Sequence, residues 1–234
     1  MIATRSQLLA TIGHEWRDQT LLDHALTHPS YATEHKTEDN ERLEFLGDAV
    51  LELVITENIT EAFPHATEGQ LSRIRSKFVR TETLARAANN WFLADSLKMG
   101  KGMTTSGGAK QSRVMAGTFE AVLGALFLDG GYQVVREIIR GVFQEHISLV
   151  DDPAHFGTDP KSALQEESMQ RIQALPEYRE IRAEGPAHER VFVWEVRVGN
   201  LAVGVGSGSS KQRAQREAAA HAIETIMKKS TRDV

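Results

Sequence analysis

The spacing of the apolar residues changes near residue 160, and this change constrains the fold more than any other feature of the chain. Before it, apolar residues recur every three or four positions, as in the runs 43–54 and 119–127, which is typical of amphipathic helices. After it, the stretch 191–198 places side chains alternately on two faces, which is typical of a strand. We therefore predict an all-α N-terminal domain followed by a small α+β domain.

A polar stretch with two prolines and a glycine separates the two patterns and reads as a linker. We assign residues 1–150 to the first domain, 151–160 to the linker and 161–230 to the second domain. The second domain has the order α-β-β-β-α. Its expected helices cover 161–174 and 209–229, and its expected strands cover 178–184, 191–198 and 201–206.

The net charge of −5 at first argues against a nucleic-acid partner, but the charge is unevenly distributed. Residues 1–157 hold 15 Lys and Arg against 21 Asp and Glu, whereas residues 158–234 hold 12 against 11. Acids gathered at a metal site depress the net charge of a protein that still binds phosphate elsewhere. The charge therefore leaves a nucleic-acid partner open.

Some classes of protein are excluded by what the sequence lacks. There is no cysteine, which rules out disulfides, thiolate metal sites and cysteine nucleophiles. The N-terminus does not resemble a signal peptide, and no run approaches the roughly 18 apolar residues that span a bilayer. We expect a cytoplasmic protein with no membrane partner.

Four carboxylates form a stripe on the expected helix that begins at residue 41. At 100° per residue, Glu41, Glu44, Asp48 and Glu52 fall within an arc of roughly 80°. Like charges one turn apart destabilise a helix, so the stripe is more easily explained if a cation binds to it. Hard cations such as Mg²⁺ take oxygen ligands, and ligand spacing for zinc is absent. A solvated acidic face is the alternative reading.

The segment 40–51, NERLEFLGDAVL, closely resembles the signature of the ribonuclease III family. Further segments agree with this resemblance: LTHPS at 26–30, EGQLSR at 68–73, SGG at 106–108 and TFEAVLGALFLDGG at 118–131. The C-terminal part resembles a double-stranded-RNA-binding domain, with DPKSALQE at its start and GSGSSKQRAQREAAA near its end. The resemblance covers nearly the whole chain in the expected domain order.

The resemblance implies an Mg²⁺-dependent endonuclease for double-stranded RNA, with Mn²⁺ as a substitute. Its products would carry 5′-phosphate and 3′-hydroxyl staggered ends, and its substrates would be ribosomal-RNA and messenger-RNA precursors. The catalytic domain would form a homodimer. Phe45 matches a residue that packs into the partner subunit in the family, and an ordinary core Phe is the alternative reading.

The resemblance also assigns the catalytic residues. Glu44, Asp48 and Glu120 match metal-site acids: Glu44 and Glu120 would bind the metal, and Asp48 would bind it or orient the attacking water. Glu41 and Glu68 match acids with supporting catalytic roles, and for both a plain surface acid is the alternative.

The chain departs from the family at Gly117, where a carboxylate is usual three residues before the last catalytic Glu. Three explanations stay open: a water fills the position, metal binding is weaker, or the chain hardly cleaves. The alternative function is therefore a cleavage-impaired protein that binds double-stranded RNA. An unrelated helical phosphohydrolase is hard to reconcile with the C-terminal domain.

Double-stranded RNA is recognised by shape, across two minor grooves and the phosphates between them. The resemblance assigns the first contact to Gln165 and Glu166 on a helix and the second to His188 in a turn. It assigns the third contact to the start of the last helix, with Lys211, Gln212 and Arg213. The family often has Lys where Gln212 stands, which weakens the phosphate contact, and Arg216 lies one turn further along. A second basic run between residues 73 and 80 either lines the RNA valley or is an ordinary surface.

Overall fold

The computed structural model describes residues 5–150, 153, 156–157, 159–186, 189–199 and 201–230. The chain forms two compact units, residues 1–156 and 157–234. Half of the expected linker, residues 151, 152, 154, 155 and 158, lies outside the described residues.

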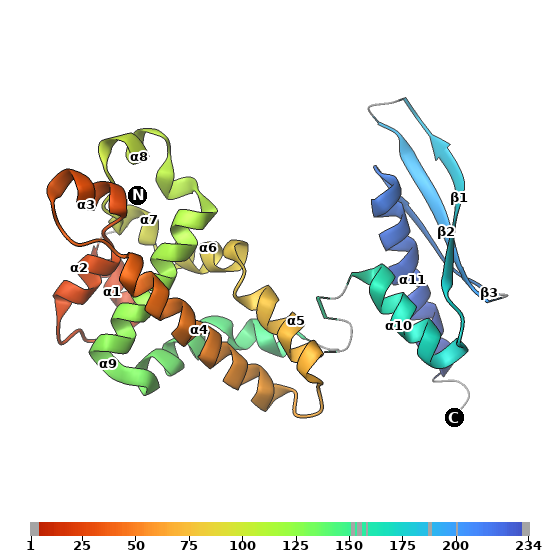
Figure 1. Cartoon of the computed structure of the whole chain (residues 1–234), viewed down its shortest axis with the longest axis horizontal. Helices are drawn as coiled ribbons and strands as arrows, with labels where there is room; N and C mark the ends of the chain where they lie inside the picture. The colour runs from red at the N-terminus through yellow and green to blue at the C-terminus, as the bar shows by residue number, and fades with distance from the viewer. Residues whose placement is uncertain are drawn as a thin grey trace. The chain divides into compact units, whose positions relative to one another are not determined.

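The described part of the first unit is helical and contains no strand, which confirms the predicted all-α domain (Figure 1). Its helices are α1 (Arg5–Ile12), α2 (Gln19–Ala25), α3 (Pro29–His35), α4 (Glu41–Ala62), α5 (Glu68–Phe78), α6 (Thr81–Asn90), α7 (Leu93–Ser96), α8 (Lys101–Thr105) and α9 (Ser112–Ser148), with a 3₁₀ turn, η1, over Gly108–Lys110.

Helices α4 and α9 form the centre of this unit and cross in direct contact (Figure 1). Apolar residues of both helices, among them Leu51, Ile55, Phe119 and Leu123, are fully buried in one hydrophobic core. Helix α9 is interrupted at Gly131, where φ is +77°, a value that favours glycine. This break separates the core-crossing half of α9 from the half that packs beside α6.

Helix α9 corrects one sequence-based expectation. By length and composition it is apolar enough to cross a membrane, although we expected no such run. However, 67% of its most apolar window is buried inside the unit. A helix that is apolar all round is explained equally well by the core of a globular domain. We therefore assign α9 as the core helix of the first unit.

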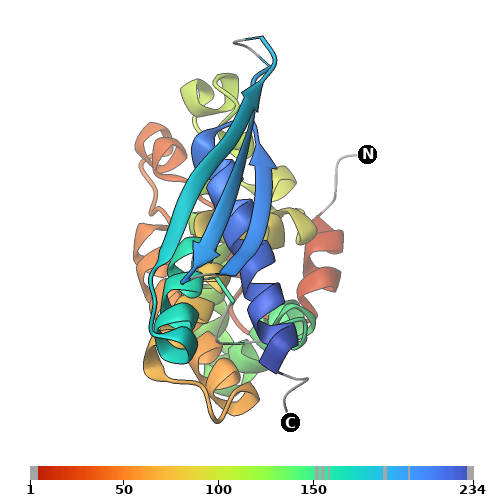
Figure 2. The same ribbon diagram turned by 90° about the vertical axis from the view of Figure 1, so that its right-hand side faces the viewer.

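The second unit contains a three-stranded antiparallel sheet in the order β1-β2-β3, which confirms the predicted α-β-β-β-α domain. Figure 2 shows the sheet with α11 across one of its faces. The elements are α10 (Pro160–Ile172), β1 (Pro176–Glu184), β2 (Val191–Val198), β3 (Leu201–Gly208) and α11 (Lys211–Ser230). Strand β3 extends two residues beyond its expected end because Ser207 and Gly208 still pair with β2.

Glycines in β3 allow α11 to lie directly on the sheet. A Cβ atom at Gly204 would lie 2.2 Å from the backbone oxygen of Ala218, and one at Gly206 would lie 2.1 Å from the nitrogen of Ala218. The facing positions of α11 are small as well, since Ala214, Ala218 and Ala222 are fully buried. This close seam fixes the start of α11 against the sheet.

A second glycine seam joins α4 and α9 in the first unit. A Cβ atom at Gly47 would lie only 1.8 Å from the backbone oxygen of Glu120, and one at Gly124 would lie 2.2 Å from the oxygen of Leu43. Real Cβ atoms do not approach backbone atoms this closely, so neither position admits a side chain without movement of a helix. The two helix backbones therefore touch beside Glu44, Asp48 and Glu120.

We predict that Gly47→Ala destabilises the first unit, because the added methyl group forces α4 and α9 apart. The cost is expected near the upper end of the about 1–3 kcal/mol typical of overpacked cores. Urea unfolding of the full chain measures it. Gly141→Ala is the matched control, because a Cβ atom there meets nothing within 4 Å. The control should gain up to about 1 kcal/mol from higher helix propensity. Equal stability of the two variants would contradict the account.

Candidate active site

The site begins with two acids one turn apart on α4, Glu44 and Asp48, on either side of the contact made by Gly47. Helix α9 adds Glu120, whose own backbone oxygen is the atom closest to Gly47. The glycine seam thus brings acids that lie more than 70 residues apart in the sequence into one electrostatic cluster. Of the three, Asp48 is exposed, whereas Glu44 and Glu120 are partly buried.

Glu120 has the most strongly shifted carboxyl group of the cluster. Burial first, and then the nearby charges of Asp48 and Glu44, together raise the pKa of Glu120 to about 8. Each of these causes disfavours the charged form of the carboxyl group, so all of them act in the same direction. Such a shift in a group that faces two other carboxylates is typical of functional sites.

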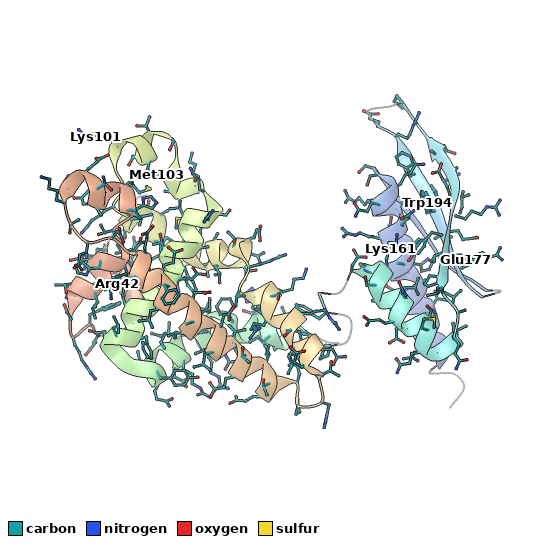
Figure 3. The ribbon with its side chains drawn as sticks, in the orientation of Figure 1. Arg42, Lys101, Met103, Lys161, Glu177 and Trp194 are labelled. Carbon is teal, nitrogen blue, oxygen red and sulfur yellow. The ribbon has the colours of Figure 1, made fainter. Side chains whose placement is uncertain are left out.

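The pKa of Glu44 is also raised, first by burial, then by the charge of Glu41, with a smaller contribution from Asp48. Glu41 therefore lies close enough to act on the cluster, at the exposed first turn of α4, where Figure 3 labels its neighbour Arg42. Arg113 acts in the opposite direction and lowers the pKa of Glu44. The first four predicted acids, Glu41, Glu44, Asp48 and Glu120, are thus brought together.

Arg113 is a residue that the sequence reasoning missed. It lies in the first turn of α9, and Gly117 and Glu120 follow it at spacings of four and seven residues, which place all three on one face of the helix. The same spacing was visible in the sequence and is the signal that would have found it. Arg113 is exposed and supplies positive charge next to Glu44.

Position 117 faces the cluster directly. A Cβ atom at Gly117 would lie 2.6 Å from Oε2 and 2.9 Å from Oε1 of Glu44. The carboxylate of Glu44 therefore lies over the bare backbone of Gly117. An acid at this position would point at Glu44, so its absence removes one oxygen from the centre of the cluster rather than from its edge.

The donors suit a hard divalent cation, because all of them are carboxylate oxygens and Glu120 lacks a compensating charge. The cluster is nevertheless not a closed cage. Among the residues that the structure describes, no group of three or more His, Cys, Asp or Glu side chains is arranged to hold a metal ion. Mg²⁺ accepts such an open arrangement, since it commonly keeps several waters and takes further oxygens from substrate phosphates.

Glu68 lies apart from the cluster within one chain. It is the first residue of α5, and its Oε1 accepts a hydrogen bond of 2.7 Å from the hydroxyl of Ser72. It lines a hollow together with Thr56 and Ile59, near the end of α4. Twelve residues of helix separate Thr56 from Glu44, which is roughly 18 Å. One chain alone therefore does not bring Glu68 to the other four acids.

Phe45 is 82% exposed, so the reading as an ordinary core residue is wrong. Leu128, on the core-crossing half of α9, is 53% exposed and lines the same hollow as Phe45. Two large apolar side chains next to each other on the surface suit a contact with another protein surface better than with water. The apolar patch adjoins Glu41, the outermost acid of the cluster.

The predicted RNA-contact residues that the structure describes lie on the second unit. Gln165 and Glu166 are exposed on α10, and Lys211, Gln212 and Arg213 are exposed in the first turn of α11. The helix start is available to anions, where free N–H groups and the helix dipole favour negative charge. His188 falls outside the described residues. Lys161, labelled in Figure 3, packs its ammonium 4.7 Å from the ring centre of Tyr178 and holds α10 to β1.

Comparison with known proteins gives the same two-part division. A family model described as Ribonuclease-III-like matches residues 18–146, and a double-stranded RNA binding motif matches residues 160–226. The curated Ribonuclease 3 of Bdellovibrio bacteriovorus is 40% identical over 228 residues, which cover 97% of each chain. The Ribonuclease 3 of Syntrophotalea carbinolica is 42% identical over 219 residues, which cover 92% of this chain and 94% of the relative.

A solved structure agrees with these matches. The nuclease domain of ribonuclease III from Campylobacter jejuni is 34% identical, with a TM-score of 0.59, and the match covers 62% of this chain and all of that domain. The family model covers more than half of the chain, and the curated relatives match it over nearly their whole length. With the acidic cluster on α4 and α9 and the α-β-β-β-α unit that follows, this chain belongs to the ribonuclease III family.

Proposed function

We propose that this chain hydrolyses double-stranded RNA as a metal-dependent endonuclease, with Glu44, Asp48 and Glu120 as its metal-binding acids. The gathering of acids from α4 and α9 at one helix contact carries the proposal, and the pKa of Glu120, raised by burial and by Asp48 and Glu44, supports it. When bound, Mg²⁺ or Mn²⁺ supplies an activated water and neutralises charge on the phosphate under attack. Family membership gives the substrate class, and the RNA-binding motif at residues 160–226 supports it.

The chain's own residues then have distinct roles. Glu120 must lose its proton before it binds a cation, so protons and metal compete for its carboxylate. Asp48, an exposed member of the cluster, is proposed to orient the water that attacks the phosphate. Arg113 adds positive charge at the edge of the cluster and offsets its repulsion of the RNA. Gln165, Glu166, Lys211, Gln212 and Arg213 hold the duplex, and we assign His188 to the same task.

The expected products have 5′-phosphate and 3′-hydroxyl staggered ends, and the expected substrates are precursors of ribosomal and messenger RNA in the cytoplasm. Two cuts in opposite strands require two sites, and we propose a homodimer whose interface includes Phe45. The 82% exposure of Phe45 supports this, as does Leu128 beside it. Glu68 keeps a supporting role in the proposal. Neither the relatives nor the geometry favours the alternative of a cleavage-impaired binding protein.

The first test is cleavage of a labelled RNA hairpin in Mg²⁺, in Mn²⁺ and in EDTA. We expect staggered products with either metal and none with EDTA. Glu120→Gln should lose at least about a hundredfold in rate, the order of effect seen when a key charged group is removed from an active site. It should still bind the hairpin.

Glu52→Gln is the matched control, because Glu52 is an exposed acid of α4 one turn beyond Asp48. Its charge is not among the causes of the pKa shift of Glu120. It should cleave as the wild type does. Tight binding without cleavage in either metal would refute the proposed activity, and equal loss in both variants would refute the assignment of Glu120.

The pH dependence of stability gives a second test, made in EDTA. The pKa of Glu120 is raised from 4.5 to about 8 in the folded chain, so between these values the folded state holds a proton that the unfolded state has lost. The contribution of Glu120 to the free energy of unfolding is therefore fully present below about pH 4.5 and is lost as the pH rises through about 8. Glu120→Gln removes this dependence.

The thermal midpoint of Glu120→Gln minus that of the wild type should increase between pH 5 and pH 8.5, two values that bracket the pKa shift. Glu52→Gln, compared in the same way, should show a constant difference. If Glu120→Gln also showed a constant difference, the carboxyl group would have an ordinary pKa and the electrostatic account of the cluster would fail.

Gly117→Asp tests the departure from the family. The new carboxylate adds an oxygen ligand beside Glu44, so half-maximal cleavage should need several times less Mg²⁺. The close atoms belong to the mobile end of Glu44, so rotation of that side chain makes room without moving either helix. Gly117→Ala is the control, since it adds the same Cβ atom against Glu44 but no ligand. An unchanged Mg²⁺ requirement in the Asp variant would show that position 117 does not limit metal binding.

A further inference from the structure

Lys211 is the first residue of α11 and the foremost candidate for contact with an RNA phosphate, yet its ammonium group already has an acidic partner. Its Nζ lies 2.9 Å from Oε2 of Glu180, on β1. The same nitrogen lies 5.8 Å from the ring centre of Phe192. A phosphate oxygen that takes a hydrogen bond from Lys211 must therefore displace the carboxylate of Glu180 or share the ammonium with it.

Glu180 is held in place more firmly than Lys211. It pairs across the strands with Trp194, and cross-strand partners project from the same face of a sheet. That face is the one against the helices, because Val196 and Val198 follow Trp194 at alternate positions and are fully buried. The side chain of Glu180 is 34% exposed, against 62% for Lys211. Glu180 therefore lies at the rim of the core, and the more exposed side chain of Lys211 contacts it there.

Other polar groups near the start of α11 show the same kind of pairing. Nε of Arg216 lies 2.6 Å from Oδ2 of Asp159, and Nζ of Lys161 donates a hydrogen bond of 2.9 Å to Oε1 of Gln215. Arg213 forms no ion pair with the described residues, although it belongs to the same turn as Lys211. Acidic side chains thus partly offset the charges of Lys211 and Arg216, and Lys211 stands at the expected phosphate position.

We propose that Glu180 competes with an RNA phosphate for Lys211 and so limits the affinity of the second unit for duplex RNA. The inference rests on the proposed function, since it takes double-stranded RNA as the ligand. An exposed ion pair contributes little free energy, so the competition is modest and reversible. Its removal should tighten RNA binding about two- to fivefold. Because the change is a gain of affinity, misfolding of a variant cannot imitate it.

The chain provides a matched control on the same strand. Glu177 is an exposed acid of β1 and is labelled in Figure 3. Side chains alternate between the two faces of a strand, so Tyr178 and Glu180 share one face and Glu177 lies on the other. Glu177→Gln removes the same charge and therefore reproduces any general change in attraction to a polyanion. Only the excess effect of Glu180→Gln over Glu177→Gln measures competition at Lys211.

The experiment measures the Kd of the full chain for a perfectly paired RNA duplex, in EDTA and at low salt, by fluorescence anisotropy. Glu180→Gln should bind about two- to fivefold more tightly than Glu177→Gln. In a Lys211→Ala background the two Gln variants should bind equally, because the ammonium for which the acid competes is gone.

Two results would overturn this inference but leave the proposed function standing. The first is equal affinity of the two Gln variants for the duplex. The second is tighter binding by Glu180→Gln than by Glu177→Gln that persists undiminished in the Lys211→Ala background. Wild-type chain that bound no duplex RNA would overturn the proposed function, and the inference with it.

Discussion

The direct contact between the backbones of α4 and α9 is the constraint on which the active site depends. Gly47 and Gly124 leave no room for a side chain between the helices, so the helices approach until backbone atoms meet. Glu44 and Asp48 flank this contact on α4, and Glu120 forms part of it on α9. Larger residues in place of the glycines would separate the helices and the acids with them. The same two glycines therefore determine both the packing of the helices and the spacing of the acids.

The cluster that results is electrostatically unfavourable without a cation. Partial burial and neighbouring acids raise the pKa of Glu44, and together they bring that of Glu120 to about 8. Arg113 offsets this only in part, through Glu44. A divalent ion bound at this contact, as we propose, would offset the repulsion and so link metal binding to the stability of the first unit.

Most of the architecture was accessible from the sequence because its signals are local. Helical spacing in residues 43–54 and 119–127 and alternation in residues 191–198 predicted the two units, and the acidic stripe of α4 predicted the first half of the site. The approach of α9 to α4 depends on glycines 77 residues apart, whose pairing no local pattern reveals. For the same reason no local pattern revealed the ion pair between Lys211 and Glu180 or the position of Gly117 against Glu44, and the sequence left two readings open for Phe45, which the structure shows to be exposed.

The central claim is that the glycine contact assembles a metal site from acids of two helices. Anomalous scattering from a crystal soaked in Mn²⁺ tests it most directly, because it locates the ion without reference to activity. The account predicts a peak within ligand distance of carboxylate oxygens from both α4 and α9, with Glu120 among them. A peak bound by α4 alone, or no peak at the cluster in a preparation that cleaves RNA with Mn²⁺, would contradict it.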